Sequence, residues 1–142
     1  MKITFMGAGS TVFSKNVLGD TMLCESFHDM KIALYDIDED RLEESYILIT
    51  AMNNTINEGR ATVEKYLGVE QRKNALRDAD FVVNAIQVGL YDPCTIIDFE
   101  IPKKYGLRQT IADTLGIGGI MRGMRTIRDC CRLATGFRDA TN

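Results

Sequence analysis

A tight glycine turn directly after a short apolar run constrains the fold of this sequence most. The apolar run extends from Lys2 to Met6 and ends in Gly7-Ala8-Gly9-Ser10. The stretch that follows, Thr11 to Cys24, repeats its apolar residues at helical intervals. The pattern predicts a strand, a turn and a helix, in an order that brings the backbone N–H groups of a helix N-terminus close to the turn.

Strands and helices are expected to alternate along the rest of the chain. Further strands are predicted at Lys31–Tyr35, Ala61–Tyr66, Phe81–Ile86 and Leu107–Ile111, and helices at Glu39–Asn57, Thr95–Tyr105 and Ile120–Leu133, with a helical turn at Asn74–Arg77. The Val-rich run Phe81–Ile86 is typical of a strand covered on both faces, so we expect it to be central. The alternation favours an α/β fold with a doubly wound, Rossmann-like parallel sheet.

Composition narrows the class of partner. The chain of 142 residues is 45% hydrophobic and 26% charged, as expected of one globular domain. Its formal net charge of -3 favours neither nucleic acid nor an anionic membrane as a partner. The first residues resemble neither a secretory leader nor a membrane span, so we expect a cytoplasmic location.

The glycine turn and the end of the second strand together suggest a dinucleotide site. Gly7 would permit the tight turn, Gly9 would let backbone N–H groups approach a pyrophosphate, and Ser10 could cap the helix and donate to phosphate. The third glycine of the usual fingerprint falls at Val12. Asp36 could accept hydrogen bonds from ribose hydroxyls, which favours NAD over NADP.

A simpler interpretation of these residues remains open. The glycines could form an ordinary strand-to-helix turn, and Asp36 could cap the next helix, although Asp38 is better placed to do so. Asn84 and Gln87 follow the apolar strand that begins at Phe81. They could face a nicotinamide ribose or satisfy backbone groups of the loop, and the sequence favours neither.

Metal-binding residues are not evident in the pattern. Cys24, Cys94, Cys130 and Cys131 lack the paired short spacings of a zinc site, and the single histidine is His28. We interpret the cysteines as reduced thiols and assign no metal ligand.

Several longer segments resemble one enzyme family. Besides the glycine turn, they are Asp36-Ile37-Asp38, Asn84 to Gly89, the run Asp98 to Thr110 and the stretch Ile111 to Arg122. These segments closely resemble glycoside hydrolase family 4, and the last one resembles its α-glucosidase and α-galactosidase branch. The resemblance extends from Met1 to about Ile127.

The resemblance implies an NAD- and Mn2+-dependent glycosidase that acts on an α-glycoside or oligosaccharide, by oxidation at sugar C3, elimination and water addition. By position it assigns Gly7, Gly9 and Ser10 to the pyrophosphate, Asp36 to the adenosine ribose, and Asn84 and Gln87 to the nicotinamide side. It makes Asp113 a candidate for substrate binding or proton transfer, although Asp113 could instead cap the glycine-rich turn that follows it. A full-length member is expected to be a homo-oligomer.

The chain departs from the family pattern at its end. The family's cysteine and histidine metal ligands, its catalytic tyrosine, the remaining strands of the sheet and the substrate domain would all follow Asn142. We therefore expect residues 1–142 to form an NAD-binding Rossmann-type domain that is incomplete relative to the family, with a diverged or truncated tail at 128–142. We therefore expect this chain alone to lack the metal site.

Two other functions fit parts of the pattern. A malate- or lactate-type NAD-dependent dehydrogenase would share the fold and the early glycine turn, although the run from Asp98 to Arg122 argues against it. A non-catalytic nucleotide-binding or dimerising module is the second alternative.

Overall fold

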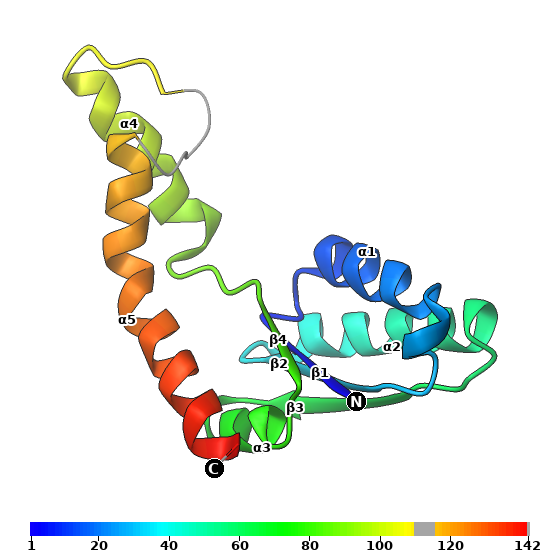
Figure 1. Ribbon diagram of the computed structural model, residues 1–142. Coiled ribbons are helices and arrows are strands. Elements are labelled where there is room, and N and C mark those ends of the chain that lie inside the picture. Colours follow the sequence, from blue (N-terminus) through cyan, green and yellow to red (C-terminus); the bar gives the residue numbers. More distant parts are fainter. Residues whose placement is uncertain (110–115, 142) are drawn as a thin grey trace. The chain divides into compact units, whose positions relative to one another are not determined.

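The computed structural model describes residues 1–109 and 116–141, and within them the protein forms a four-stranded sheet with flanking helices (Figure 1). The strands are β1 (Lys2–Met6), β2 (Lys31–Asp36), β3 (Thr62–Leu67) and β4 (Phe81–Asn84). The α-helices are α1 (Thr11–Met22), α2 (Glu39–Ile56), α3 (Arg72–Leu76), α4 (Ile96–Lys104) and α5 (Ile117–Thr141). Two 3₁₀ turns, η1 (Glu25–Phe27) and η2 (Val69–Gln71), and a π-helical turn, η3 (Leu90–Thr95), complete the elements.

All four strands run parallel in the order β3-β2-β1-β4. Met6 of β1 lies opposite Tyr35 of β2 and Asn84 of β4, so the strands end side by side at one edge of the sheet. The chain builds outward from β1 first to β2 and β3 and then, in the other direction, to β4. The point where the direction changes lies between β1 and β4, and ligands of such sheets bind at the carboxyl ends of the strands beside this point.

Helices cover both faces of the sheet, as a doubly wound fold requires. Phe5 packs into a buried cluster with Leu18 of α1 and Ile49 of α2. The neighbouring Thr4 faces the opposite way, and its Oγ1 donates a hydrogen bond of 2.8 Å to the carbonyl of Ala75 in α3. Successive residues of a strand point to opposite faces, so α1 and α2 lie on one face and α3 on the other. The predicted α/β fold is confirmed.

Two strand predictions are wrong. The strand beginning at Phe81 lies at the edge of the described sheet rather than at its centre, and Phe81 itself is 55% exposed. The sequence of β4 is apolar enough to be buried, but no described strand pairs with β4 on the side away from β1. No strand forms at residues 107–109, because the Leu107 N–H donates to the carbonyl of Pro102 and the segment closes the end of α4. Residues 110 and 111 of that prediction lie outside the described residues.

The helix-cap predictions have opposite outcomes. Asp38 caps α2, since its side chain accepts a hydrogen bond of 3.1 Å from the Arg41 N–H. Ser10 occupies the cap position of α1, but its side chain makes no capping hydrogen bond. The last predicted helix, Ile120–Leu133, is present as part of the longer α5.

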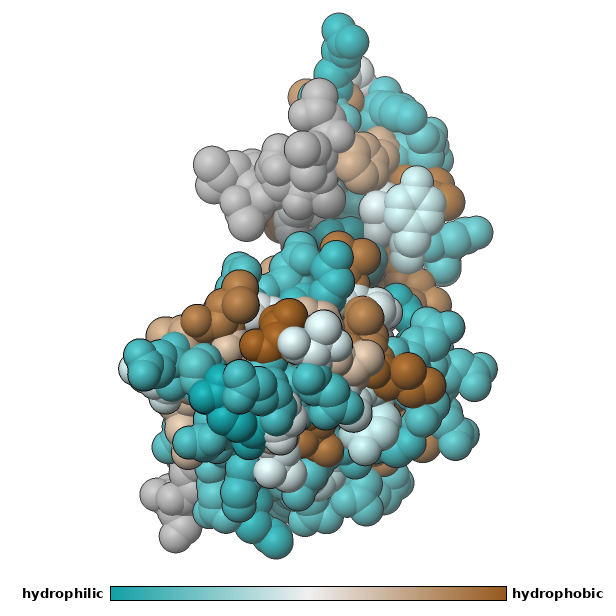
Figure 2. All heavy atoms as spheres, turned by 90° about the vertical axis from the view of Figure 1, so that its right-hand side faces the viewer, coloured by the Kyte–Doolittle hydropathy of each residue, from teal (hydrophilic) through white to brown (hydrophobic). Residues whose placement is uncertain are grey.

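The described chain divides into two compact units. The first contains residues 1–86, with the sheet and α1 to α3, together with the end of α5 from Gly136. The second is Gln87–Thr135, with η3, α4 and most of α5. Polar and apolar side chains are interspersed on the face shown in Figure 2. The exposed apolar residues of the chain include Val12 and Ile37.

Candidate functional site

The turn after β1 requires a glycine at its first position. Gly7 has φ +86°, and a Cβ added there would lie 2.7 Å from the carbonyl oxygen of Ala85. The N–H groups of Gly7 and Ala8 both donate to the carbonyl of Tyr35 at 2.9 Å. The turn is therefore fixed between the ends of β2 and β4, at the carboxyl edge of the sheet.

Gly9 and Asp36 are in direct contact across this edge. The Gly9 N–H donates to Oδ2 of Asp36 at 2.7 Å. Oδ1 of Asp36 accepts from the N–H groups of Ile37 at 2.7 Å and Asp38 at 3.1 Å. Three backbone donors thus hold one carboxylate at the end of β2.

The space beside Gly9 is occupied by the chain itself. A Cβ on Gly9 would lie 2.8 Å from Oδ2 of Asp36 and 2.9 Å from Cβ of Arg41. The sequence suggested that Gly9 makes room for a pyrophosphate. The structure adds a second reason, which is that a larger residue would displace Asp36 and Arg41.

The first turn of α1 offers donors at the same edge. Among the described residues, no backbone acceptor is found for the N–H groups of Thr11, Val12 and Phe13. The hydrogen bonds of the helix begin at Ser14, whose N–H donates to the carbonyl of Ser10. Unpaired amides at the N-terminus of a helix suit an anion. By contrast, the amides of Gly7 to Ser10 all donate within the chain.

Ser45 of α2 stabilises the turn through a hydrogen bond that the sequence pattern did not predict. Its hydroxyl donates to the carbonyl of Ala8 at 2.6 Å from a fully buried position on α2. Ser45 lies three residues after Leu42 and four before Ile49, two core residues of the same helix. A polar residue on an apolar helix face is the signal that could have identified it.

Asn84 lies at the same edge as Gly7 and Asp36. Its Oδ1 accepts from the N–H of Ile86 at 3.3 Å, which is the backbone-satisfying role that the sequence left open. The next peptide is joined to β1, because the Ala85 N–H donates to the carbonyl of Met6 at 2.8 Å.

Gln87 belongs to the second unit, where it joins a side-chain network. Its Nε2 donates to Oγ1 of Thr95 at 3.1 Å, and Nη2 of Arg122 donates to the same oxygen at 2.7 Å. Asp113 is not among the described residues.

A buried ion pair lies beside this network. Asp98 on α4 is fully buried, and both of its carboxylate oxygens accept from the guanidinium of Arg125 on α5. Nε of Arg122 lies 3.8 Å from the same carboxylate. Hydrogen bonding to Asp98 raises the pKa of Arg125 above its ordinary value, so the guanidinium stays charged. The sequence alone does not show that Asp98, unlike other acidic residues, is buried.

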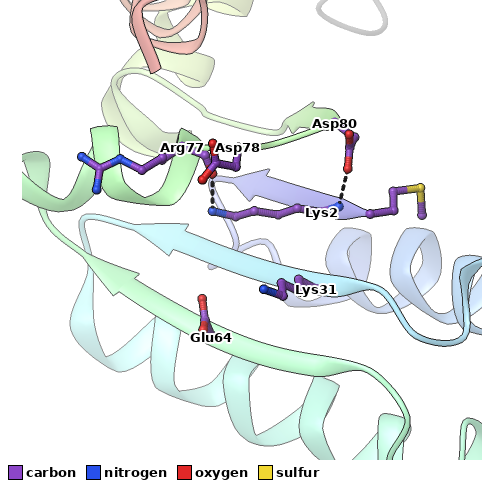
Figure 3. Close-up of a pocket in the computed structure, with 7 residues that line it drawn as sticks. Lys2, Lys31, Glu64, Arg77, Asp78 and Asp80 are labelled. Carbon is purple, nitrogen blue, oxygen red and sulfur yellow. Dashed lines mark hydrogen bonds between the residues drawn. The ribbon is translucent and has the colours of Figure 1, made fainter. Parts of the chain in front are cut away.

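A hollow of about 280 Å³ lies at the opposite edge of the sheet from the glycine turn (Figure 3). Lys2 crosses it, donating from its backbone to Asp80 and from Nζ to the carbonyl of Arg77, both at 2.7 Å. Burial lowers the pKa of Lys2 from its ordinary value. The hollow is lined by the basic residues Lys31 and Arg77 and by the acidic residues Glu64 and Asp78. Because it lies at the amino ends of the strands and carries both charge signs, the carboxyl edge is the better candidate for a dinucleotide.

Among residues 1–109 and 116–141, no three His, Cys, Asp or Glu side chains come together in a way that could hold a metal ion. Within the same residues, no helix is both long enough and apolar enough to cross a membrane.

Comparison with protein families gives a match over almost the whole chain. The model of family 4 glycosyl hydrolases matches residues 2–141. An α-galactosidase of Bacillus subtilis (strain 168) is 57% identical over 126 residues, which are 89% of this chain and 28% of that protein. An α-galacturonidase of the same strain is 30% identical over 139 residues, or 98% of this chain and 29% of that protein. The chain thus spans less than a third of the length of these relatives.

Solved structures show the same relationship. A 6-phospho-α-glucosidase from gut microorganisms, in complex with NAD and glucose-6-phosphate, superposes with a TM-score of 0.81 at 25% identity, covering 100% of this chain and 31% of that one. A 6-phospho-β-glucosidase of Thermotoga maritima, with manganese, NAD+ and glucose-6-phosphate, gives a TM-score of 0.77 at 25% identity, covering 99% and 32%.

Proposed function

Because this chain belongs to family 4 of the glycosyl hydrolases, we propose that it is the NAD-binding part of an α-glycosidase. The observation that carries the proposal is the carboxyl edge of the sheet, where Gly7, Asp36 and the N-terminus of α1 lie together. The 57% identity to an α-galactosidase favours α-galactosides as substrates of the longer enzyme. The family match favours this function over the malate- or lactate-type dehydrogenase.

The residues at this edge suit a dinucleotide. The pyrophosphate would be held by the backbone amides of Thr11, Val12 and Phe13. Gly7 would keep the turn close to the Ala85 carbonyl, so that the pyrophosphate can approach these amides. Asp36 would accept from the adenosine ribose, since each carboxylate oxygen has two lone pairs and three backbone donors leave one of the four free. Ser10 would donate to phosphate, because its hydroxyl makes no capping bond.

The remaining assignments stay predictions. Asn84 and Gln87 are proposed for the nicotinamide side, and Asp113 for the substrate. Bound NAD+ would supply a hydride acceptor for the oxidation of the sugar. The described residues offer no cluster of His, Cys, Asp or Glu that could hold Mn2+. We also propose that residues 1–142 act as one cofactor-binding domain of a cytoplasmic enzyme.

The proposal is tested by titrating NAD+ into the purified chain and into Gly7→Ala. The new Cβ would meet the Ala85 carbonyl and push the turn out of place. We expect affinity for NAD+ to fall at least about tenfold, the equivalent of about 1.4 kcal/mol.

Gly106→Ala is the matched control. Gly106 has a similar φ of +73°, but a Cβ added there meets nothing within 4 Å. It carries the same backbone strain without the clash, so NAD+ affinity should not change. Equal losses in the two variants, or no NAD+ binding by the parent chain, would refute the proposal.

A further inference from the structure

Two large apolar side chains are exposed on neighbouring residues of the second compact unit. Tyr91 is 70% exposed and Leu90 is 59% exposed. They begin η3, the π-helical turn that follows the loop after β4. Leaving most of a tyrosine ring in water forgoes much apolar burial. Because single π-helical turns occur frequently at functional sites, these two side chains are candidates for contact with a ligand.

The backbone that presents them is strained. Leu90 has φ +54°, in the left-handed region that residues other than glycine rarely adopt. The preceding Gly89 has φ +88°, and a Cβ added there would lie 2.8 Å from Cβ of Cys94. Such strain persists only where the surrounding structure enforces it, and it clusters at active sites and ligand-binding sites.

Hydrogen bonds hold the backbone of both residues in place. The carbonyl of Leu90 accepts from Oγ1 of Thr95 at 3.4 Å, and this oxygen also belongs to the side-chain network described above. The carbonyl of Tyr91 accepts from the N–H of Ile96, the residue after η3. The backbone is thus fixed while the two side chains remain exposed. A ligand that binds to them would therefore lose little affinity to ordering of the loop.

The chain reaches this turn directly after the carboxyl end of β4. Asn84 ends that strand, and Tyr91 follows seven residues later. In open parallel sheets the loops after the strand ends carry many of the ligand contacts. A single ring on a fixed backbone suits a small rigid ligand, whereas a stable protein partner needs about 1,200 Å² of buried surface or more. Membership of a glycosyl hydrolase family makes a sugar the small ligand to consider.

We propose that the ring of Tyr91 is a stacking surface for the galactosyl unit of an α-galactoside, and that Leu90 is a positioning residue that sets the direction of this ring. The inference rests on the proposed function, because it assigns a sugar contact to the same enzyme. Galactose has an axial C4 hydroxyl, which leaves the C–H groups at C3, C4 and C5 together on one face. The negative face of an aromatic ring attracts such C–H groups.

The test measures binding of methyl α-D-galactopyranoside to the parent chain, with NAD+ present, by saturation-transfer difference NMR. We expect the protons on C3, C4 and C5 to receive the most saturation. Methyl α-D-glucopyranoside, which differs only at C4, should bind at least about threefold more weakly. Tyr91→Ala should lower the galactoside affinity about tenfold, whereas Tyr91→Phe, which keeps the ring, should stay within about twofold of the parent.

Tyr105→Ala is the matched control. Tyr105 is 76% exposed in the same unit, but it lies at the end of α4 on a backbone with an ordinary φ of -102°. Its loss should leave the galactoside affinity unchanged. Circular dichroism checks the fold of each variant. Equal losses in Tyr91→Ala and Tyr105→Ala, or full affinity in folded Tyr91→Ala, overturn the inference.

Leu90→Gly tests the positioning role. Glycine adopts a positive φ without strain, so the variant should unfold at a temperature no lower than the parent does. The freed turn should nevertheless bind the galactoside about threefold more weakly. An unchanged affinity refutes the role of Leu90. A parent chain that binds NAD+ but not the galactoside overturns this inference alone, whereas a parent chain that does not bind NAD+ overturns the proposed function.

Discussion

The two compact units contrast in what they bury. The unit that contains the sheet, residues 1–86 with the end of α5, is here called the sheet unit, and it buries apolar side chains, among them Phe5, Leu34 and Ile49. The unit Gln87–Thr135 buries a carboxylate, Asp98, which is held by Arg125. An apolar core loses stability gradually as side chains are shortened, whereas a buried ion pair fails when either partner is removed. Adjacent parts of one chain thus depend on different kinds of interaction.

The largest effect should come from the apolar core. Phe5→Ala removes a fully buried ring that contacts Phe13 edge-to-face with centroids 5.7 Å apart. We expect the free energy of unfolding to fall by about 4 kcal/mol, measured by urea denaturation. Phe81→Ala is the control, because Phe81 lies in the same sheet but is 55% exposed, and its loss should be below about 1.5 kcal/mol. Similar losses in both variants would contradict the contrast.

The second-largest effect should be confined to the unit Gln87–Thr135. Asp98→Ala leaves Arg125 without its partner, at a cost of about 3 kcal/mol, the lower end for buried pairs because 27% of the Arg125 side chain reaches solvent. Hydrogen exchange should accelerate in α4 and in α5 up to Thr135, and stay slow in β1 and β2. Glu100→Gln, which disrupts the exposed pair with Lys103, should change exchange little. Equal acceleration in β1 would show that the units do not respond separately.

The smallest effect concerns the sheet unit at high pH. Burial, with a hydrogen bond of 2.6 Å from Tyr66 to Glu64, raises the pKa of Tyr66 to about 12. An unfolded chain loses this proton near pH 10. The folded state therefore binds more protons between pH 10 and 12, and the stabilisation present below pH 10 is lost as pH rises through that window.

Tyr66→Phe tests this directly. Ultraviolet absorbance of the parent chain should show the phenol of Tyr66 ionising near pH 12, and the variant should lack that step. The variant's stability should also fall less steeply above pH 10. A parent titration complete by pH 11 would count against the structure around Tyr66.

Most of the fold was predictable because it depends on local periodicity. The strands Lys2–Met6 and Lys31–Asp36 and the cap at Asp38 each have a signal within a few residues. The position of Phe81 at the sheet edge was not predictable, since an apolar run does not say which strands will flank it.

The candidate site shows the same division. Gly7 and Asp36 were found because a glycine turn and a strand-end carboxylate lie in fixed places along the chain. Ser45 and Asp98 were not, because in sequence a buried serine or aspartate looks like an exposed one, and only tertiary packing separates them. The closeness of Arg41 to the turn was not predictable either, because sequence separation does not show that its Cβ lies 2.9 Å from the place a Cβ on Gly9 would take.

The carbonyl of Tyr35, which receives the N–H groups of both Gly7 and Ala8, makes the glycine turn a rigid extension of strand β2. A ligand arriving there meets a backbone that is already ordered, so little conformational entropy is lost when it binds. The same coupling acts in reverse. A change in the core that loosens β2 would weaken ligand binding without altering a single residue of the site, and a bound ligand would protect β2 from opening.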